Sequence, residues 1–427
     1  MRAPKPLQGA LLAGLAVTLI SAPAHADRRT SLAGNQLIKD RDDSFVYPQA
    51  MLEYNNTLSL DYGAAETDGN ALLIAGPNKK SALGVALHRG DVTMPLGGLS
   101  YLVKDLERGV LGGAPSLSPD AEVFGTAASI ADLMYAMRLG KNSLGFRLGL
   151  TSVGDISTPD KGKDSGSAGF GVRVSAGYSM GKRGDFVFDF SNTSGSQVQE
   201  NKNVREFSVL GAHLGGRFRV SQNQAKTFKL VALADFNFAS TSDTDLVAPG
   251  DPAVTNQVFS LMAGFGPAYS TKDKKLKVAF HATAGFVSNS SDPNTEVKED
   301  GDSRALVVFP GFNVALEYAI RDWLYFRSGA ISAFSLLSTS AERGDARSQN
   351  GLSPLFGWNA GLGVALERFK LDATLNHGFI TNGPAILSGA QTAGMLALVS
   401  ATVAFGDAGR APRAEGEQPA GAQPKKD

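Results

Sequence analysis

The charged residues on the polar faces of alternating segments are the residues of this sequence best placed to do chemistry. Segments such as Ser143 to Thr151 and Gly184 to Asn192 place apolar residues on one face and Arg, Asp, Gly or Ser on the other. If such a face encloses water, its charges select ions and solutes. The predicted inward-facing residues are Arg147, Arg173, Asp189, His213, Arg217, Arg219, Asp235, His281, Glu317, Arg327 and Asp372.

The same charges allow a second arrangement. Arginine and carboxylate side chains on neighbouring strands can pair with one another and fill the interior. A conducting pore lined by charge and a packed interior held by ion pairs are therefore both compatible with the pattern.

Enzyme chemistry has little support in the sequence. His213 and His281 lie far apart along the chain, and no serine lies in a G-x-S-x-G elbow between a strand and a helix. The absence of cysteine excludes thiol nucleophiles, disulfides and zinc-thiolate sites. The acidic stretch 290–302 has oxygen ligands suited to calcium but not the spacing of an EF-hand loop, so it is interpreted as solvated charge. We expect no catalytic residue, metal or cofactor.

Nucleic acid is also an unsuitable partner. The 427 residues contain 41 Lys and Arg against 41 Asp and Glu, for a net charge of zero. A nucleic-acid-binding protein usually presents an excess of positive charge.

An alternation of period two runs from about residue 50 to residue 405. In one example Phe186, Phe188 and Phe190 share a face, opposite Val187 and Asp189. Because successive strand side chains point to opposite faces, each segment has one apolar and one polar side. The segments are about ten residues long or longer, which is the length that crosses a bilayer at a tilt.

The connections between these segments alternate between short and long. Seven short turns are predicted at 77–80, 140–142, 181–184, 221–226, 271–275, 320–322 and 366–368. Longer loops are predicted near 63–68, 91–128, 154–168, 193–204, 241–255, 289–303, 339–351 and 378–392. This pattern predicts an all-β fold, a closed antiparallel transmembrane β-barrel of sixteen strands, with fourteen as the second choice because 70–76 is weakly patterned. Closure is required because lipid offers no partner to an unpaired peptide group.

The two ends of the chain have different compositions. Arg2 and Lys5, an apolar run and the small-x-small sequence 24–26 predict a signal peptide. The tail is rich in Ala, Gly, Pro and charge and is predicted to be disordered. The predicted organisation is a signal peptide at 1–26, a pre-barrel segment that forms a small plug at 27–50, a barrel at 51–405 and a periplasmic tail at 406–427.

Two prolines and one loop interrupt this regular plan. Pro267 and Pro310 fall inside good strands, where proline lacks the ladder donor, so each predicts a bulge or a local opening in the wall. The loop 91–128 is the longest and either folds back to narrow the pore or caps the barrel.

The last segment and the overall plan resemble known families. Met395, Val399, Val403 and Phe405 share a face in a segment that resembles the C-terminal signal strand of Gram-negative outer-membrane proteins, which their assembly machinery reads. An exported barrel with a pre-barrel segment, Gly-rich strands and mid-strand prolines resembles the outer-membrane channels for long-chain fatty acids and aromatic hydrocarbons. Residues 32–48 resemble the start of those proteins, although Tyr47-Pro48-Gln49 replaces their usual Asn-Pro-Ala.

These features and resemblances imply a location and a function. We expect a protein of the bacterial outer membrane with periplasmic termini, in contact with membrane lipid and lipopolysaccharide and inserted by the barrel-assembly machinery. The expected function is a channel for passive uptake or efflux of small solutes, hydrophobic ones included. The alternative is a structural or adhesin-like display barrel with a filled lumen.

Overall fold

The computed structural model describes residues 28–63, 70–78, 80–89, 128–153, 156–157, 165–199, 202–246, 254–292, 302–341, 349–375 and 396–405. The predicted signal peptide, residues 91–127 of the longest loop and the predicted tail lie outside the described residues.

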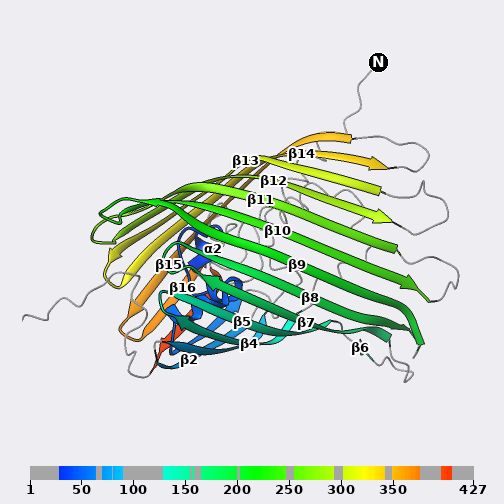
Figure 1. Cartoon of the computed structure of the whole chain (residues 1–427), viewed down its shortest axis with the longest axis horizontal. Coiled ribbons are helices and arrows are strands. Elements are labelled where there is room, and N and C mark those ends of the chain that lie inside the picture. The colour runs from blue at the N-terminus through cyan, green and yellow to red at the C-terminus, as the bar shows by residue number, and fades with distance from the viewer. Residues whose placement is uncertain are drawn as a thin grey trace, which may run out of the picture.

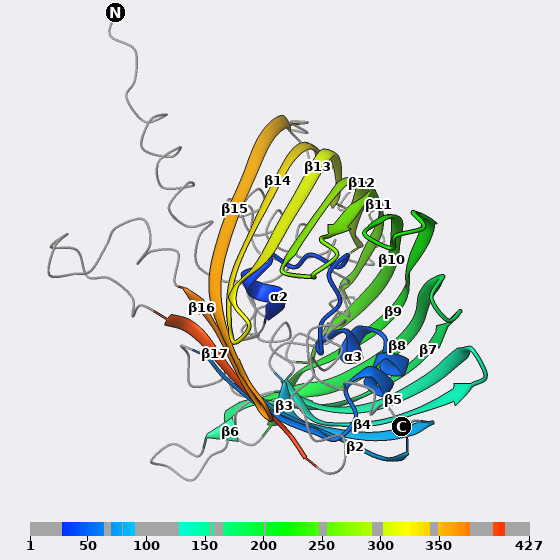
Figure 2. The ribbon, with the colours of Figure 1, turned by 90° about the vertical axis from the view of Figure 1, so that its left-hand side faces the viewer.

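The described strands form one closed antiparallel sheet (Figures 1 and 2). Sixteen strands of the described chain make the wall, as predicted, and the two-residue strand β6 (Ile156–Ser157) only extends the pairing of β7. The wall strands are β1 (Thr57–Gly63), β2 (Asn70–Asn78), β3 (Ser81–Arg89), β4 (Ala128–Leu139), β5 (Asn142–Val153), β7 (Ser165–Ser179), β8 (Gly184–Gln199), β9 (Lys202–Gln222), β10 (Phe228–Asp245), β11 (Val254–Ser270), β12 (Leu276–Asp292), β13 (Asp302–Arg321), β14 (Leu324–Ala341), β15 (Gln349–Leu366), β16 (Phe369–Leu375) and β17 (Leu396–Ala404).

The barrel closes between its first and last strands. β1 pairs with β17 from Thr57 opposite Ala404 to Gly63 opposite Leu398, while its other side pairs with β2. A flat sheet of the same strands would leave two rows of unpaired peptide groups, each costing several kcal/mol in hydrocarbon. Closure removes both rows.

The alternating pattern determines which side chains face outward. Phe188 is 51% exposed on the outer surface, whereas its neighbour Asp189 is 1% exposed and faces the interior. On β10 the outward residues from Phe228 to Phe238 are apolar, and Ser240 follows on the same face. Ten residue steps of ~3.4 Å at a tilt of ~45° cover about 25 Å, the height of the apolar band on outer-membrane barrels.

Several strands continue well beyond this band. β9 has 21 residues and β8 extends to Gln199, so most of the loop predicted near 193–204 is strand. The loops predicted near 241–255, 289–303 and 339–351 are shortened in the same way. The prediction was wrong there because both faces of a strand are polar above the band, so the alternation disappears while the ladder hydrogen bonds continue.

The chain before the barrel lies inside it (Figure 2). It forms the short helices α2 (Arg28–Ser31) and α3 (Asp43–Val46) and the 3-10 helix η1 (Pro48–Glu53). The wall begins at Thr57 rather than at residue 51, because the apolar residues of η1 pack against the inner wall instead of entering the sheet. We refer to residues 28–54 as the plug.

None of the helices in the described ranges is long and apolar enough to cross a membrane.

The two prolines affect the wall differently. Pro310 follows a cis peptide bond and lies in a bulge, where the register of β13 shifts by one residue against both β12 and β14. At Pro267 no register shift occurs, so the bulge predicted there is absent. Instead the β11–β12 pairing is interrupted at Gly266 and Pro267, because proline has no N–H to donate.

The outward assignment of β8 gives a testable prediction. Phe188→Arg places a charge within the apolar band and is expected to destabilise the folded barrel by ~2–4 kcal/mol, against ~0–1 kcal/mol for Ser194→Arg on the same face beyond the band. The measurement is the free energy of unfolding of each variant refolded into lipid vesicles. Equal losses at the two positions would contradict the assigned membrane band.

Candidate functional site: the plugged lumen and its basic cavity

The plug occupies the lumen and contacts opposite parts of the wall. α2 lies against β14, β15 and β16, while η1 lies against β3, β4, β5 and β7. Most plug residues are buried, polar ones included. The lumen at this level is therefore filled by the chain's own N-terminal segment.

Glycines on the inner wall allow this close approach. A Cβ atom at Gly145 would lie 2.1 Å from the backbone nitrogen of Gln49, and one at Gly329 would lie 2.2 Å from the carbonyl carbon of Leu32. Any larger residue at these two positions would collide with the plug backbone. The glycine-rich inner face thus serves at these points to seat the plug as well as to line the lumen.

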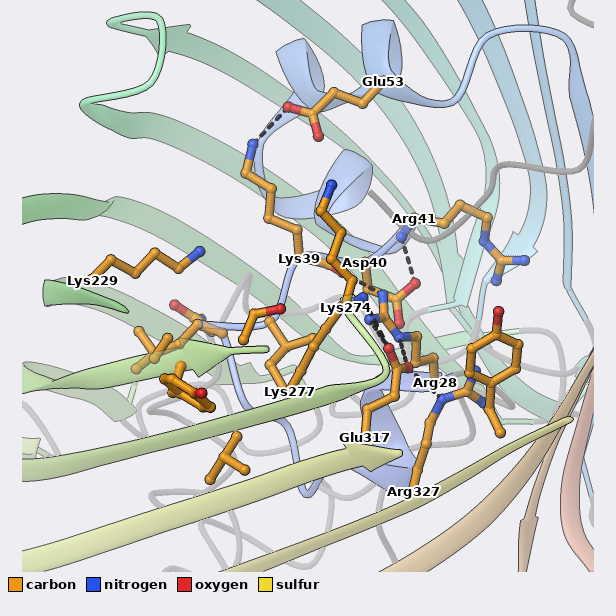
Figure 3. Close-up of a pocket in the computed structure, with 18 of the residues that line it drawn as sticks. Arg28, Lys39, Asp40, Arg41, Glu53, Lys229, Lys274, Lys277, Glu317 and Arg327 are labelled. Carbon is orange, nitrogen blue, oxygen red and sulfur yellow. Dashed lines mark hydrogen bonds and ion pairs between the residues drawn. The ribbon is translucent and has the colours of Figure 1, made fainter. Parts of the chain in front are cut away.

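A first cluster of charges surrounds Glu317 (Figure 3). Arg28 of the plug donates two hydrogen bonds to the Glu317 carboxylate, from Nε at 2.5 Å and from Nη2 at 2.7 Å. Arg327 donates from Nε at 2.8 Å, and Lys277 Nζ lies 3.0 Å from the other oxygen. Arg327 also pairs with Asp372 at 2.5 Å, so the cluster links the plug to four wall strands, β12, β13, β14 and β16.

A second cluster runs around the wall through Asp189. Its carboxylate accepts hydrogen bonds from Arg147 at 3.2 Å and pairs with Arg173 at 3.4 Å. His213 Nδ1 lies 2.9 Å from Asp189 Oδ2, and its Nε2 lies 3.1 Å from Asp235 Oδ1. The Arg147 guanidinium also donates to the carbonyl oxygen of Phe45 in the plug. This cluster therefore contacts the plug through a hydrogen bond to a backbone carbonyl group.

A third cluster centres on Asp43 of the plug. Arg217 of the wall donates to Asp43 Oδ2 at 2.7 Å and to Asp185 Oδ2 at 2.7 Å. Arg29 pairs with the other oxygen of Asp43. The Arg217 guanidinium carbon lies 4.7 Å from the centroid of the Tyr47 ring, a cation–π geometry.

A fourth cluster lies where the barrel closes. Arg41 of the plug donates to both carboxylate oxygens of Asp61 at 3.1 Å and to Thr402 Oγ1 at 3.0 Å. Since Asp61 belongs to β1 and Thr402 to β17, one plug arginine bridges the first and last strands.

Two titratable groups of the plug have shifted pKa values. Burial alone would lower the pKa of Arg28, but the attraction of Glu317 outweighs it and holds the pKa above its usual range. Burial raises the pKa of the Tyr47 phenol, so it stays neutral beside Arg217. Because the folded-state pKa of Tyr47 lies above the unfolded one, its contribution to stability is complete below pH ~10 and is lost only at higher pH.

The other side of the lumen is apolar. Leu32, Leu37 and Ile38 of the plug belong to a cluster of buried side chains that continues over the inner faces of β10 to β14 and includes Met262 and Val308. Phe45, Met51 and Leu52 pack on a second apolar patch, on β2 to β4, so the plug contacts the wall through apolar patches as well as ion pairs.

Nearly all the predicted inward-facing residues lie in these clusters. The two exceptions are Arg219, which is half-buried near a turn and donates to Gln222 at 2.6 Å, and His281, which is buried with no hydrogen-bond partner for Nδ1 within the described structure. The sequence did not reveal the other charged members of these clusters, which come from the plug and the wall: Arg28, Arg29, Arg41, Asp43, Asp61, Asp185 and Lys277. The dense charge of Lys39 to Asp43 was the available signal, because a simple linker needs no such run.

A cavity of about 1240 Å³ lies at the short-turn end of the barrel (Figure 3). Its lining combines plug residues from Gln36 to Arg41 with the turns at 181–184, 225–227 and 271–274. Fourteen of the lining residues are Lys or Arg and seven are Asp or Glu. The cavity is therefore strongly basic, although the whole chain is neutral.

Within the ranges the structure describes, no group of three or more His, Cys, Asp or Glu side chains is arranged to hold a metal ion. The acidic residues 293–301 lie outside those ranges.

No family model and no curated protein matches this chain. Solved structures similar to it include the CymD monoaromatic hydrocarbon channel, at 10% identity over 90% of this chain and 97% of that one, with a TM-score of 0.37. The ferric preacinetobactin receptor BauA from Acinetobacter baumannii has 11% identity over 74% of this chain, with a TM-score of 0.40. The translocator domain of the autotransporter NalP from Neisseria meningitidis has 10% identity over 71% of this chain and 98% of that one, with a TM-score of 0.29.

The chain spans about half of the length of BauA, 53%. The channel family that the sequence resembles is represented among the similar structures by CymD.

The Glu317 cluster gives a second testable prediction. Glu317→Gln leaves Arg28, Arg327 and Lys277 around a neutral amide, and removing one partner of a buried pair costs about 3–5 kcal/mol. Glu53→Gln removes the exposed partner of Lys39 and is expected to cost ~1 kcal/mol or less. The measurement is the midpoint of heat unfolding, followed by the gel mobility of heated and unheated protein. Similar midpoints for the two variants would contradict a structural role for this cluster.

Proposed function

We propose that this chain is a transport channel of the bacterial outer membrane whose resting state is closed by its own plug. The observation that carries the proposal is that four separate clusters of charged groups join the plug to the wall. The small solutes it admits, hydrophobic ones included, cross passively once the plug is displaced.

The chemistry of these contacts supports a displaceable plug. The guanidinium and carboxylate groups of the four clusters lose hydration when they pair, and they recover it when water enters between them. An interface made only of apolar side chains would expose its whole area to water on opening, at about 25 cal/mol for each Å². The apolar strip around Leu32 forms the hinge side of this proposal.

The outer surface supports the proposed location. The apolar band suits hydrocarbon, and outer-membrane barrels have short periplasmic turns and longer outer loops. In this orientation both termini and the basic cavity face the periplasm. Membrane lipid and lipopolysaccharide cover the outer face, and the barrel-assembly machinery inserts the chain by reading its last strand.

The alternative function is a structural or adhesin-like display barrel whose lumen stays filled. The observation that favours it is the saturation of Asp189 and Glu317, each of which has three cationic or imidazole partners. The two functions differ in whether the plug ever leaves the lumen.

A reversible disulfide bond between the plug and the wall tests the proposal. The Ser31 and Thr374 hydroxyl oxygens lie 3.0 Å apart, one on the plug and one on β16. Since the chain has no cysteine, the double variant Ser31→Cys, Thr374→Cys can form only this disulfide within a chain. The disulfide keeps the plug in the lumen, so the open state is no longer populated. Solute flux into liposomes is therefore expected to fall at least about ten-fold on oxidation and to recover on reduction.

The matched control ties two wall strands. The Ser59 and Thr402 hydroxyl oxygens are also 3.0 Å apart and join β1 to β17, so Ser59→Cys, Thr402→Cys is expected to show the same flux in both redox states. Flux that is unchanged when the plug is tied would refute plug displacement. Absence of flux in the reduced plug variant and in the unmodified protein, for every solute tried, would favour the filled structural barrel.

A further inference from the structure

We infer that the cavity at the short-turn end binds a free anion that carries several carboxylate or phosphate groups. This goes beyond the proposed function, because the anion can bind there without crossing the barrel. The first observation is the twofold excess of Lys and Arg over Asp and Glu in the cavity lining, in a chain whose net charge is zero.

Five of the seven acidic residues of the lining have a cationic partner, and the other two are Asp40 and Glu367. Glu317 and Asp372 are held by Arg28, Arg327, Lys277 and Lys370. Outside this cluster Asp185 pairs with Arg217, Glu53 with Lys39, and Asp322 lies near Lys275. Little carboxylate charge is left to neutralise the other cations.

Six of the other cations, all except Arg41 and Lys229, gather at the short-turn end, and we refer to these six as the crescent. They lie on or next to three successive turns, between β7 and β8, between β9 and β10, and between β11 and β12. None of them has a carboxylate partner within the described residues. The crescent consists of Lys182, Arg183, Arg219, Lys226, Lys272 and Lys274.

The shape of the site favours a small multivalent anion over a single carboxylate. A concave wall of one sign concentrates field lines and raises the local concentration of the opposite charge. Six cations on three separate turns can contact several anionic groups at once, and the volume of about 1240 Å³ admits a ligand of that size. The plug residue Lys39 also lines the cavity, where its ammonium group pairs with Glu53 (Figure 3).

The test is equilibrium binding to the full chain in detergent, with citrate and tripolyphosphate as probes. The crescent variant Lys226→Gln, Lys272→Gln, Lys274→Gln removes three exposed cations from the cavity. It is expected to raise the Kd for the better probe about ten-fold, since an exposed ion pair contributes a fraction of a kcal/mol. The comparison between the two probes shows whether carboxylate or phosphate groups are preferred.

The control removes the same charge from turns that do not line the cavity. Lys80, Arg138 and Lys141 are exposed on or beside two other short turns, and the variant Lys80→Gln, Arg138→Gln, Lys141→Gln is expected to change the Kd less than about two-fold. Equal effects of the two triple variants, or no binding by the unmodified chain, would overturn the inference. Neither result bears on plug displacement, which the redox experiment tests separately.

A second arm distinguishes a free anion from a lipid headgroup. The binding measurement is repeated in nanodiscs of zwitterionic lipid and in nanodiscs that contain anionic lipid. Equal affinity for the soluble probe in both supports the free anion. Loss of probe binding only beside anionic lipid would assign the crescent to headgroups and overturn the inference.

Discussion

Hydrocarbon offers no hydrogen-bond partner to a peptide group, and the rest of this structure depends on that constraint. A spanning sheet has to close, and here the first strand pairs with the last. Closure in turn creates an interior, and alternation sends every second side chain into it. The arginines and carboxylates of the inner wall are therefore a consequence of strand geometry, and the interior has to solvate or pair them.

Pairing dominates at the level of the plug. Four clusters connect the plug to the wall, and each one includes a plug atom: the guanidinium groups of Arg28 and Arg41, the carboxylate of Asp43 and the carbonyl oxygen of Phe45. The two arrangements that the sequence allows, a lined pore and a packed interior, thus meet in one molecule. The wall has the charged lining of a pore, and the plug converts that lining into an ion-paired interior.

Charge is also divided along the barrel axis. Carboxylates of the wall pair with specific cations. The cations of the crescent, on the turns beside the basic cavity, have no carboxylate partner within the described residues. The neutral average of the chain hides this separation, because a composition counts charges without regard to position. The result is a closed lumen with a positively charged mouth, an arrangement that attracts anions to the plug without requiring them to pass it.

The sequence by itself determined the class of fold, the strand number and the direction of most wall side chains. Phe188 and Asp189 were assigned to opposite faces by the period of two alone, because that period follows from local backbone geometry. The loop between β8 and β9 was misjudged since its strands lose the alternation beyond the apolar band. Pro310 and Pro267 looked alike in sequence, yet only Pro310 lies in a bulge, because register depends on both neighbouring strands.

Only the tertiary structure decided what fills the lumen. One partner of Glu317 is Arg28, 289 residues away, and the partner of Thr374 is Ser31, 343 residues away. No local pattern encodes contacts of that separation. They exist because closure of the barrel brings distant strands around a segment that precedes them all, and because a buried charge stays buried only where an opposite charge reaches it.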